Sequence, residues 1–162
     1  MANKILHVRE TDVTWRNTGG SELLTLTSVG SGAGRQGARH DFTTGSIART
    51  YEWSAFLQLV ATPTLGELIY IYWKFSNGTQ AGNDDGTGDI VVSAIDKLRN
   101  LQLIGAIEID QAAANIEMTA SGILTLNSRY GHPVFWNAAA VALTATATEH
   151  GFTLTPIVPE VQ

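Results

Sequence analysis

The stretch that decides the fold reads RTYEWSAFLQLVA at Arg49–Ala61 and GELIYIYWKFS at Gly66–Ser76, with a short turn between the two segments. The second segment is β-branched and aromatic almost throughout, a composition typical of a pleated and largely buried surface. In the first segment, apolar side chains recur at every second position and therefore share one face of a strand: Tyr51, Trp53, Ala55, Leu57 and Leu59. We predict two long core strands, paired as a hairpin.

The remaining chain carries shorter strand-like segments. They are expected at 5–15, 23–29, 90–92, 101–110, 116–126, 132–137 and 151–158, with one short helical turn over 94–99. The expected total is about eight to nine strands. Long strands joined by long loops favour an all-β fold, a β-sandwich of the jelly-roll kind. A chain of 162 residues suits one such domain, residues 1–162, with residues 1–20 as a candidate N-terminal arm.

Two Gly-rich stretches, Gly30–Asp41 and Asn77–Asp89, show no periodicity and are expected to be irregular loops. Pro133 lies in a short aromatic segment at 132–137, and its missing N–H places this segment at a sheet edge or a strand start. Gly105, inside a predicted strand, indicates a bulge or a close approach of another group to the backbone.

Composition excludes several classes of function. A net charge of −5 argues against a nucleic-acid partner, because phosphates are neutralised by Lys and Arg. The chain has no Cys, which excludes disulfides and thiolate metal sites. No apolar run approaches the ~18 residues of a membrane span, and the N-terminus lacks the apolar core of a signal peptide. We expect a product made in the cytoplasm, without a membrane or nucleic-acid partner.

Two motifs are weak candidates for ligand binding. Gly32–Gly37 matches the G-x-G-x-x-G pattern, but no helix follows it to hold a pyrophosphate, so no cofactor is expected. Residues 83–89 gather three carboxylates that could attract Ca²⁺, but they lack the spacing and the final Glu of an EF-hand loop. The blander interpretation, a solvated turn, is favoured, and no metal site is predicted.

No catalytic residues are predicted. None of the four His residues has the H-x-x-x-H spacing of a metal site, and no Ser lies in a nucleophile-elbow pattern. We therefore expect a protein that is not an enzyme.

Several phrases together resemble small structural proteins of tailed-bacteriophage virions. The resemblance covers roughly Arg49 to the C-terminus and is carried by WKFSNGT (73–79), DKLRNLQLIG (96–105), SGILTL (121–126), RYGHPVFWN (129–137) and FTLTP (152–156). Within that class, the size, the absence of Cys and the all-β prediction resemble capsid decoration (cement) proteins. The resemblance implies a protein made in the host cytoplasm that binds the virion's capsid exterior and bridges capsomers.

The implied partners are the major capsid protein and further copies of the chain, as a homotrimer or homodimer. The Gly-rich loops and the N-terminal segment are the expected contact regions, and Arg35 and Arg39 are expected to pair with acidic capsid groups. The candidate partner-binding residues are Arg35, Arg39, His40, Asn83, Asp84 and Asp85. Two alternatives stay open: a tail, adaptor or baseplate component, and a glycan-binding module of a virion appendage, which would present an exposed Trp or Tyr platform.

Overall fold

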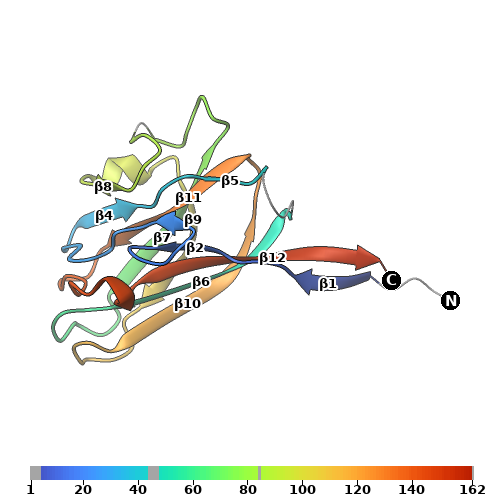
Figure 1. Cartoon of the computed structure of the whole chain (residues 1–162). Coiled ribbons are helices and arrows are strands. Elements are labelled where there is room, and N and C mark those ends of the chain that lie inside the picture. Colours follow the sequence, from blue (N-terminus) through green and yellow to red (C-terminus); the bar gives the residue numbers. More distant parts are fainter. Residues whose placement is uncertain (1–4, 44–47, 84, 162) are drawn as a thin grey trace.

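The computed structural model describes residues 5–43, 48–83 and 85–161, and within them the chain forms two six-stranded sheets packed face to face (Figure 1). The elements, in chain order, are β1 (Ile5–Arg9), β2 (Val13–Arg16), β3 (Glu22–Leu23), β4 (Ala33–Gln36), β5 (His40–Asp41), β6 (Thr50–Gln58), β7 (Leu68–Ser76), β8 (Ile90–Val92), the 3-10 helix η1 (Ile95–Leu98), β9 (Gln102–Glu108), β10 (Glu117–Thr125), β11 (Tyr130–Asn137), the 3-10 helix η2 (Ala147–Glu149) and β12 (Gly151–Val161).

The strand order is that of a jelly roll. Sheet A runs β10-β6-β12-β2-β3, with β1 also paired to β12, and sheet B runs β8-β4-β11-β7-β9, with β5 also paired to β11. In the eight principal strands, the first pairs with the last (β2 with β12), then β4 with β11, β6 with β10 and β7 with β9. This nested pairing confirms the predicted all-β sandwich of the jelly-roll kind.

The predicted hairpin of the two core strands is wrong. β6 pairs with β10 and β12 in sheet A, whereas β7 pairs with β11 and β9 in sheet B, so the two strands face each other across the core. Each strand is flanked by two neighbours in its own sheet, and almost all of its inward side chains are buried. The connection between them crosses from one sheet to the other instead of making a tight turn.

Three local predictions also fail for identifiable reasons. Of the Leu-Thr alternation at 23–29, only Leu23 belongs to a strand, because Ser28 takes a left-handed φ of 59° and turns the chain. The supposed loop at Gly30–Asp41 contains β4 and β5. Pro133 lies in the central strand β11, where its carbonyl accepts from Gly37 N at 2.9 Å. Its missing N–H therefore faces the Gly37 carbonyl, which bonds His132 Nδ1 instead, at 2.9 Å.

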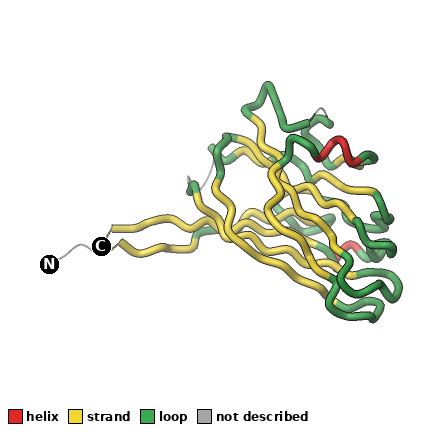
Figure 2. Tube along the Cα trace, turned by 180° about the vertical axis from the view of Figure 1, so that it is seen from behind, coloured by secondary structure: helices red, strands yellow, loops and turns green. Residues whose placement is uncertain are grey.

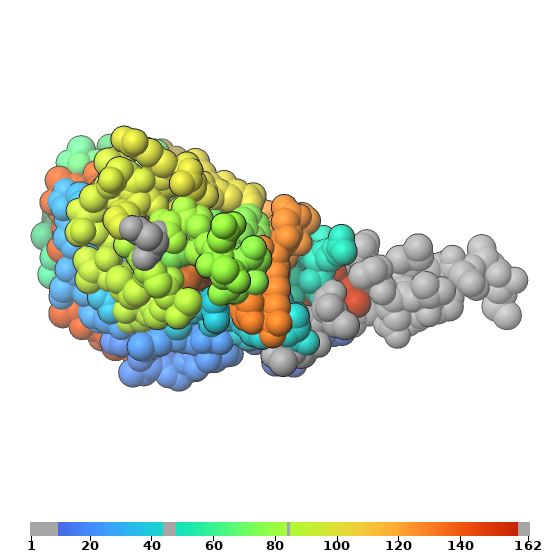
Figure 3. All heavy atoms as spheres, turned by 90° about the horizontal axis from the view of Figure 1, so that it is seen from above, coloured from blue at the N-terminus to red at the C-terminus, as the bar shows by residue number. Residues whose placement is uncertain are grey.

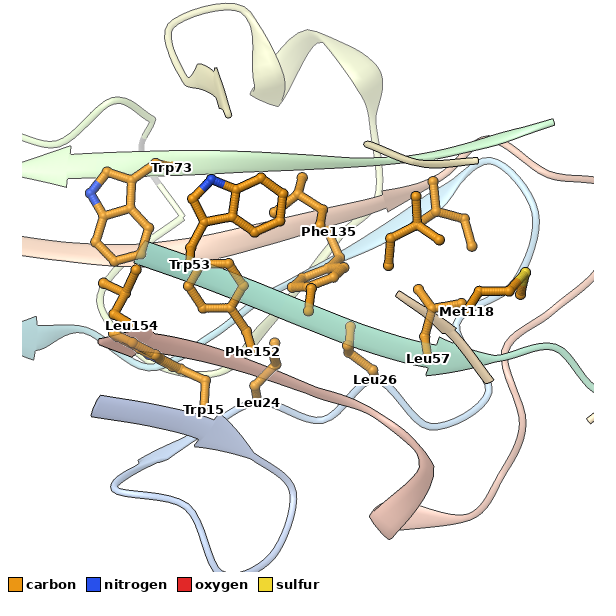
Figure 4. Packing of buried hydrophobic residues seen from close by; sticks show 14 of the residues in the cluster. Trp15, Leu24, Leu26, Trp53, Leu57, Trp73, Met118, Phe135, Phe152 and Leu154 are labelled. Atoms are coloured by element: carbon orange, nitrogen blue, oxygen red, sulfur yellow. The ribbon is translucent and has the colours of Figure 1, made fainter. Parts of the chain in front are cut away.

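The core lies between the sheets and is rich in aromatic rings (Figure 4). Phe152 of β12 is fully buried at its centre, with its ring centroid 5.8–6.1 Å from those of Trp15, Trp53, Trp73 and Phe135. Edge-to-face and offset contacts at these distances stabilise beyond the burial of area alone. All four Trp of the chain are buried, so none forms an exposed stacking platform.

The outer faces of the two sheets differ. The segment between β7 and β9, residues 77–83 and 85–101, contributes the edge strand β8, and its remaining residues lie over the outer face of sheet B; we call it the cover segment (Figure 3). A second apolar cluster lies beneath it, built from Val92 and Leu98 of the cover segment and from Val134 and Trp136 of β11. The outer face of sheet A has no such cover in the described chain, and its β6 and β10 strands line a shallow hollow with Ser, Thr, Phe56 and Glu117.

A two-stranded ribbon leaves the sandwich at one end (Figure 2). It consists of β1 and the last part of β12, paired antiparallel from Ile5 with Val161 to Arg9 with Ile157. Ile5 and Val161, the first and last described residues, therefore lie together at the tip of one projection, away from the cover segment (Figure 1).

Candidate functional site

The cover segment is attached to sheet B by buried polar side chains. Lys74 of β7 is fully buried, and its Nζ donates to Gln36 Oε1 at 2.7 Å and to the Gly86 carbonyl at 3.0 Å. Gln36 is also fully buried, and its Nε2 donates to the Gly88 carbonyl at 3.0 Å. A buried ammonium is tolerated only when its donors are satisfied, so these bonds hold the cover segment in one place.

Arg35 is bound within its own chain. Its Nε and Nη2 donate to the two carboxylate oxygens of Asp89 at 2.6 and 2.8 Å, a bidentate pair. Burial alone raises the pKa of Asp89, but hydrogen bonds from Arg35 and Thr25 outweigh this effect and hold the pKa below its usual value. This pair ties β4 to the residue that directly precedes the edge strand β8.

Three more of the predicted partner-binding residues make internal contacts. His40 Nδ1 lies 2.8 Å from Glu22 Oε1, and its ring packs edge-on against Phe42. Asn83 Nδ2 donates to the Lys97 carbonyl at 3.3 Å, and Asp85 forms an ion pair with Lys97 at 3.0 Å. Asp84 lies outside the described residues.

The carboxylates of the 83–89 loop that the structure describes therefore pair with cationic side chains of the chain itself. No group of three or more His, Asp or Glu residues in the described part of the chain is arranged to hold a metal ion.

Arg39 differs from the other predicted residues. Its guanidinium Cζ lies 4.1 Å from the centroid of the Tyr130 ring, and its backbone N–H donates to the Thr87 carbonyl at 2.9 Å. No side-chain or backbone oxygen in the described residues accepts a hydrogen bond from its guanidinium. Arg129 also contacts the Tyr130 ring, at 4.7 Å, but its guanidinium is hydrogen-bonded, because Nε and Nη2 both donate to the Asp41 carboxylate.

A pocket of about 200 Å³ opens beside Arg39, and we call it the Arg39 pocket. Its walls come from the start of the cover segment and from the end of β7. The polar lining residues are Arg39, Ser76, Thr79, Gln80, Asn83 and Thr87. No Asp or Glu is among the described residues that line it. Sequence reasoning selected Arg39 and Asn83 separately, and the fold brings the two to one pocket.

The ribbon offers a second candidate site, formed by backbone groups. Glu10 N donates to the Pro156 carbonyl, and the pairs continue with Val8 opposite Val158 and Leu6 opposite Glu160. In an antiparallel ladder the intervening residues direct their N–H groups to the other side, so those of Ile5, His7 and Arg9 face outward. The outer edge of β1 is therefore free to pair, within the described chain.

The other edge of the ribbon is blocked. β6 pairs with β12 only as far as Ile157, which lies opposite Thr50. Beyond this point Pro159, opposite His7, stands at a position whose backbone nitrogen faces away from β1, and proline has no N–H to donate there. The ribbon thus has one open edge, that of β1, and one edge interrupted by proline.

Two features of the candidate sites were missed by sequence reasoning. Lys74 occurs in an otherwise apolar strand, and this exception to the pattern was a signal for a buried and bonded cation. Tyr130 gave no local signal, because its position under Arg39 depends on the pairing of β11 with β5. Both helices in the described chain are single 3-10 turns, too short to span a membrane.

Comparison with known proteins finds no family model that matches the chain and no curated protein with significant similarity to it.

Proposed function

We propose that this protein is a structural component of a phage virion that binds the capsid exterior and bridges neighbouring capsomers. The proposal starts from the resemblance of the chain, from roughly Arg49 to the C-terminus, to virion structural proteins. The structural observation that supports it best is the ribbon, in which β1 and the end of β12 project from a closed jelly roll with one strand edge open to a partner.

The ribbon has the properties of an assembly element. A two-stranded ribbon is marginally stable by itself in water, since it has no third strand and no layer to pack against. An open strand edge recruits another strand, and the main-chain hydrogen bonds give affinity. We infer that the β1 edge adds to a strand of the major capsid protein, and that each copy thereby gains its stable form only on the particle.

The remainder of the molecule suits a rigid spacer. The cover segment is fixed to sheet B by buried polar bonds, and the core is closed by aromatic packing. Bridging of capsomers then follows when a dimer or trimer of the chain presents several ribbons, because linked weak contacts gain affinity through effective concentration. The function proposed here is structural and uses no catalytic group.

The test is add-back to capsids that lack the protein. The variant His7→Pro removes an outward N–H of β1, and the control His7→Thr keeps it. We expect the wild type and His7→Thr to bind at equal occupancy and to raise the temperature of capsid disruption, and His7→Pro to bind at least ten-fold more weakly. Occupancy is measured by gel densitometry of sedimented particles.

Two results would count against the proposal. One is equal occupancy of His7→Pro and His7→Thr, provided that near-UV circular dichroism shows both sandwiches intact. The other is a particle image that places the protein in the tail or baseplate instead of on the shell.

A further inference from the structure

We propose that the Arg39 pocket binds an acidic sugar, with the carboxylate of a uronic-acid unit on the Arg39 guanidinium. The site is separate from the ribbon, and the inference does not depend on the capsid-binding role.

The Arg39 guanidinium is placed and oriented before any ligand arrives. Its Cζ lies over the Tyr130 ring, 4.1 Å from the ring centroid, and this contact with the ring face uses none of its N–H groups as a donor to an oxygen. Those N–H groups form the planar fork that matches a carboxylate. The neighbouring Arg129 has its charge compensated by Asp41, whose pKa the Arg129 and Thr43 hydrogen bonds hold well below its usual range.

The composition of the pocket selects an anion. The chain has 15 acidic residues against 10 Lys and Arg, yet none of the described lining residues is acidic. The two described carboxylates of the adjoining loop, Asp85 and Asp89, are bound by Lys97 and Arg35. A negatively charged ligand therefore meets one unused cation and no described competing carboxylate.

The walls select a polyhydroxylated ligand over a bare carboxylate. Ser76 is buried and its Oγ accepts from Gly78 N at 3.1 Å, which leaves its hydroxyl hydrogen to donate to a ligand. Thr79, Thr87 and Gln80 add hydroxyl and amide groups. The volume of about 200 Å³ is more than one carboxylate fills and leaves room for a sugar ring.

The rim of the pocket is rigid. Asn77 Oδ1 accepts from Thr79 N at 2.9 Å and from Gln80 N at 2.7 Å, so a side chain fixes the turn that carries two wall residues. Gly78 has a φ of 99°, and a Cβ at this position would lie 3.0 Å from the Tyr130 ring. A preformed rim reduces the ordering cost of binding.

The experiment is a titration of the full chain, followed by ¹H–¹⁵N correlation spectra. The ligands are D-glucuronate and D-galacturonate, with D-glucose as a ring without the carboxylate and acetate as a carboxylate without the ring. We expect shifts at Gly78, Thr79, Gln80 and Thr87 with a uronate, several-fold weaker binding of acetate, and no shifts with glucose.

Variants assign the binding to Arg39. Arg39→Gln is expected to weaken uronate binding at least ten-fold, and Arg39→Lys to retain part of it. Arg99→Gln is the matched control, because Arg99 is exposed on another part of the cover segment and does not line the pocket. It should leave binding unchanged.

Several results would overturn the inference. They are the absence of shifts with either uronate, equal binding of glucose or acetate, and equal loss in Arg39→Gln and Arg99→Gln. Should Arg39→Gln fail to fold, the chemical-shift changes of the wild type still test the proposal. Changes centred away from the Arg39 pocket would exclude this pocket as the binding site. Capsid add-back with Arg39→Gln remains a separate measurement, so failure here leaves the capsid-binding proposal as it stands.

Discussion

At the scale of single residues, three fully buried polar side chains lie beneath the cover segment: Gln36, Lys74 and His132. Gln36 and Lys74 bond each other and the carbonyls above them, whereas His132 bonds only the Gly37 carbonyl through Nδ1, at 2.9 Å. Its Nε2 is buried without a hydrogen-bond partner in the described residues. The Nδ1 bond fixes the neutral tautomer with the proton on Nδ1, because a carbonyl can only accept.

Acid should destabilise the protein through His132. Burial, and then the charge of Lys74, lower the pKa of His132 to about 3 from the usual 6.5. Below pH 6.5 the unfolded chain takes up a proton that the folded chain refuses, so stability is lost as the pH falls toward 3. We expect a loss of about 2 kcal/mol between pH 7 and pH 5 from this residue, at 1.36 kcal/mol per pH unit below 6.5.

Urea denaturation at a series of pH values measures this effect. His132→Asn, whose amide nitrogen can replace Nδ1, should be less stable at pH 7 but should lose most of the dependence between pH 5 and pH 7. His150, whose pKa burial also lowers, accounts for a smaller remainder. An unchanged slope in His132→Asn would contradict the assignment.

Loss of Arg35 should leave the buried Asp89 carboxylate without its cationic partner. The Asp89 side chain is only 4% exposed, and its carboxylate depends on the bidentate bond from Arg35. We expect Arg35→Ala to lower the free energy of unfolding by about 3 kcal/mol, the low end for breaking a buried pair because Arg35 itself is partly exposed. Trp fluorescence in urea gives the value. Arg99→Ala should stay within about 0.5 kcal/mol of the wild type.

At the scale of elements, glycines in the strands make room for the tryptophans. Trp53 of β6 lies against Gly122 of β10 in its own sheet and against Gly105 of β9 in the opposite sheet. The ladder between β7 and β9 slips at this point, since Ile71 pairs with Gly105 but Tyr72 pairs with Leu103. The prediction that Gly105 marks a bulge or a close approach is confirmed on both counts.

A methyl group at Gly105 should therefore be costly. An added Cβ would lie 2.6 Å from Cζ2 of Trp53, which is held in the core and has little freedom to move. We expect Gly105→Ala to destabilise the fold by about 2 kcal/mol through overpacking. Gly30→Ala is the matched control, because a Cβ there meets nothing within 4 Å, and it should be neutral. Equal midpoints of the two variants in thermal unfolding would disprove this account.

At the scale of the whole molecule, the jelly roll is closed by its two ends. β12 pairs with β2 and β6 inside sheet A and with β1 in the ribbon, so the last strand joins the first parts of the chain. Its inward residues Phe152 and Leu154 are fully buried. The sandwich is therefore complete only once the C-terminal strand is present, whereas the ribbon lies beyond it.

Two truncations separate these roles. A chain that begins at Glu10 should keep the sandwich, because it loses only β1 and its pairing with β12. A chain that ends at His150 should not fold, since it loses the strand between β6 and β2 together with the central ring of the core. Dispersed ¹H–¹⁵N spectra are expected for the first and collapsed spectra for the second, and a dispersed spectrum of the second would refute this view of closure.

The sequence alone determined the fold class and most of the long strands. The period-two pattern of Tyr51, Trp53, Ala55 and Leu57 is a local property of the chain, and it carries over directly into the buried face of β6. The same applies to the segments that became β9, β10 and β12, which the sequence placed within a few residues. Alternation reports burial of one face, and this was enough to predict a sandwich.

Only the tertiary structure decided which strand pairs with which and where the polar groups meet. Two strands show the same alternation of apolar residues whether they pair in one sheet or face each other across the core. The sequence therefore predicted a hairpin of β6 and β7, although they belong to opposite sheets. The Arg39 pocket and the Arg35–Asp89 pair join residues about 40 to 90 positions apart, brought together by the long-range pairings β4–β8, β5–β11 and β7–β11. Such contacts leave no local pattern, because they depend on the register of strands that are distant in the chain.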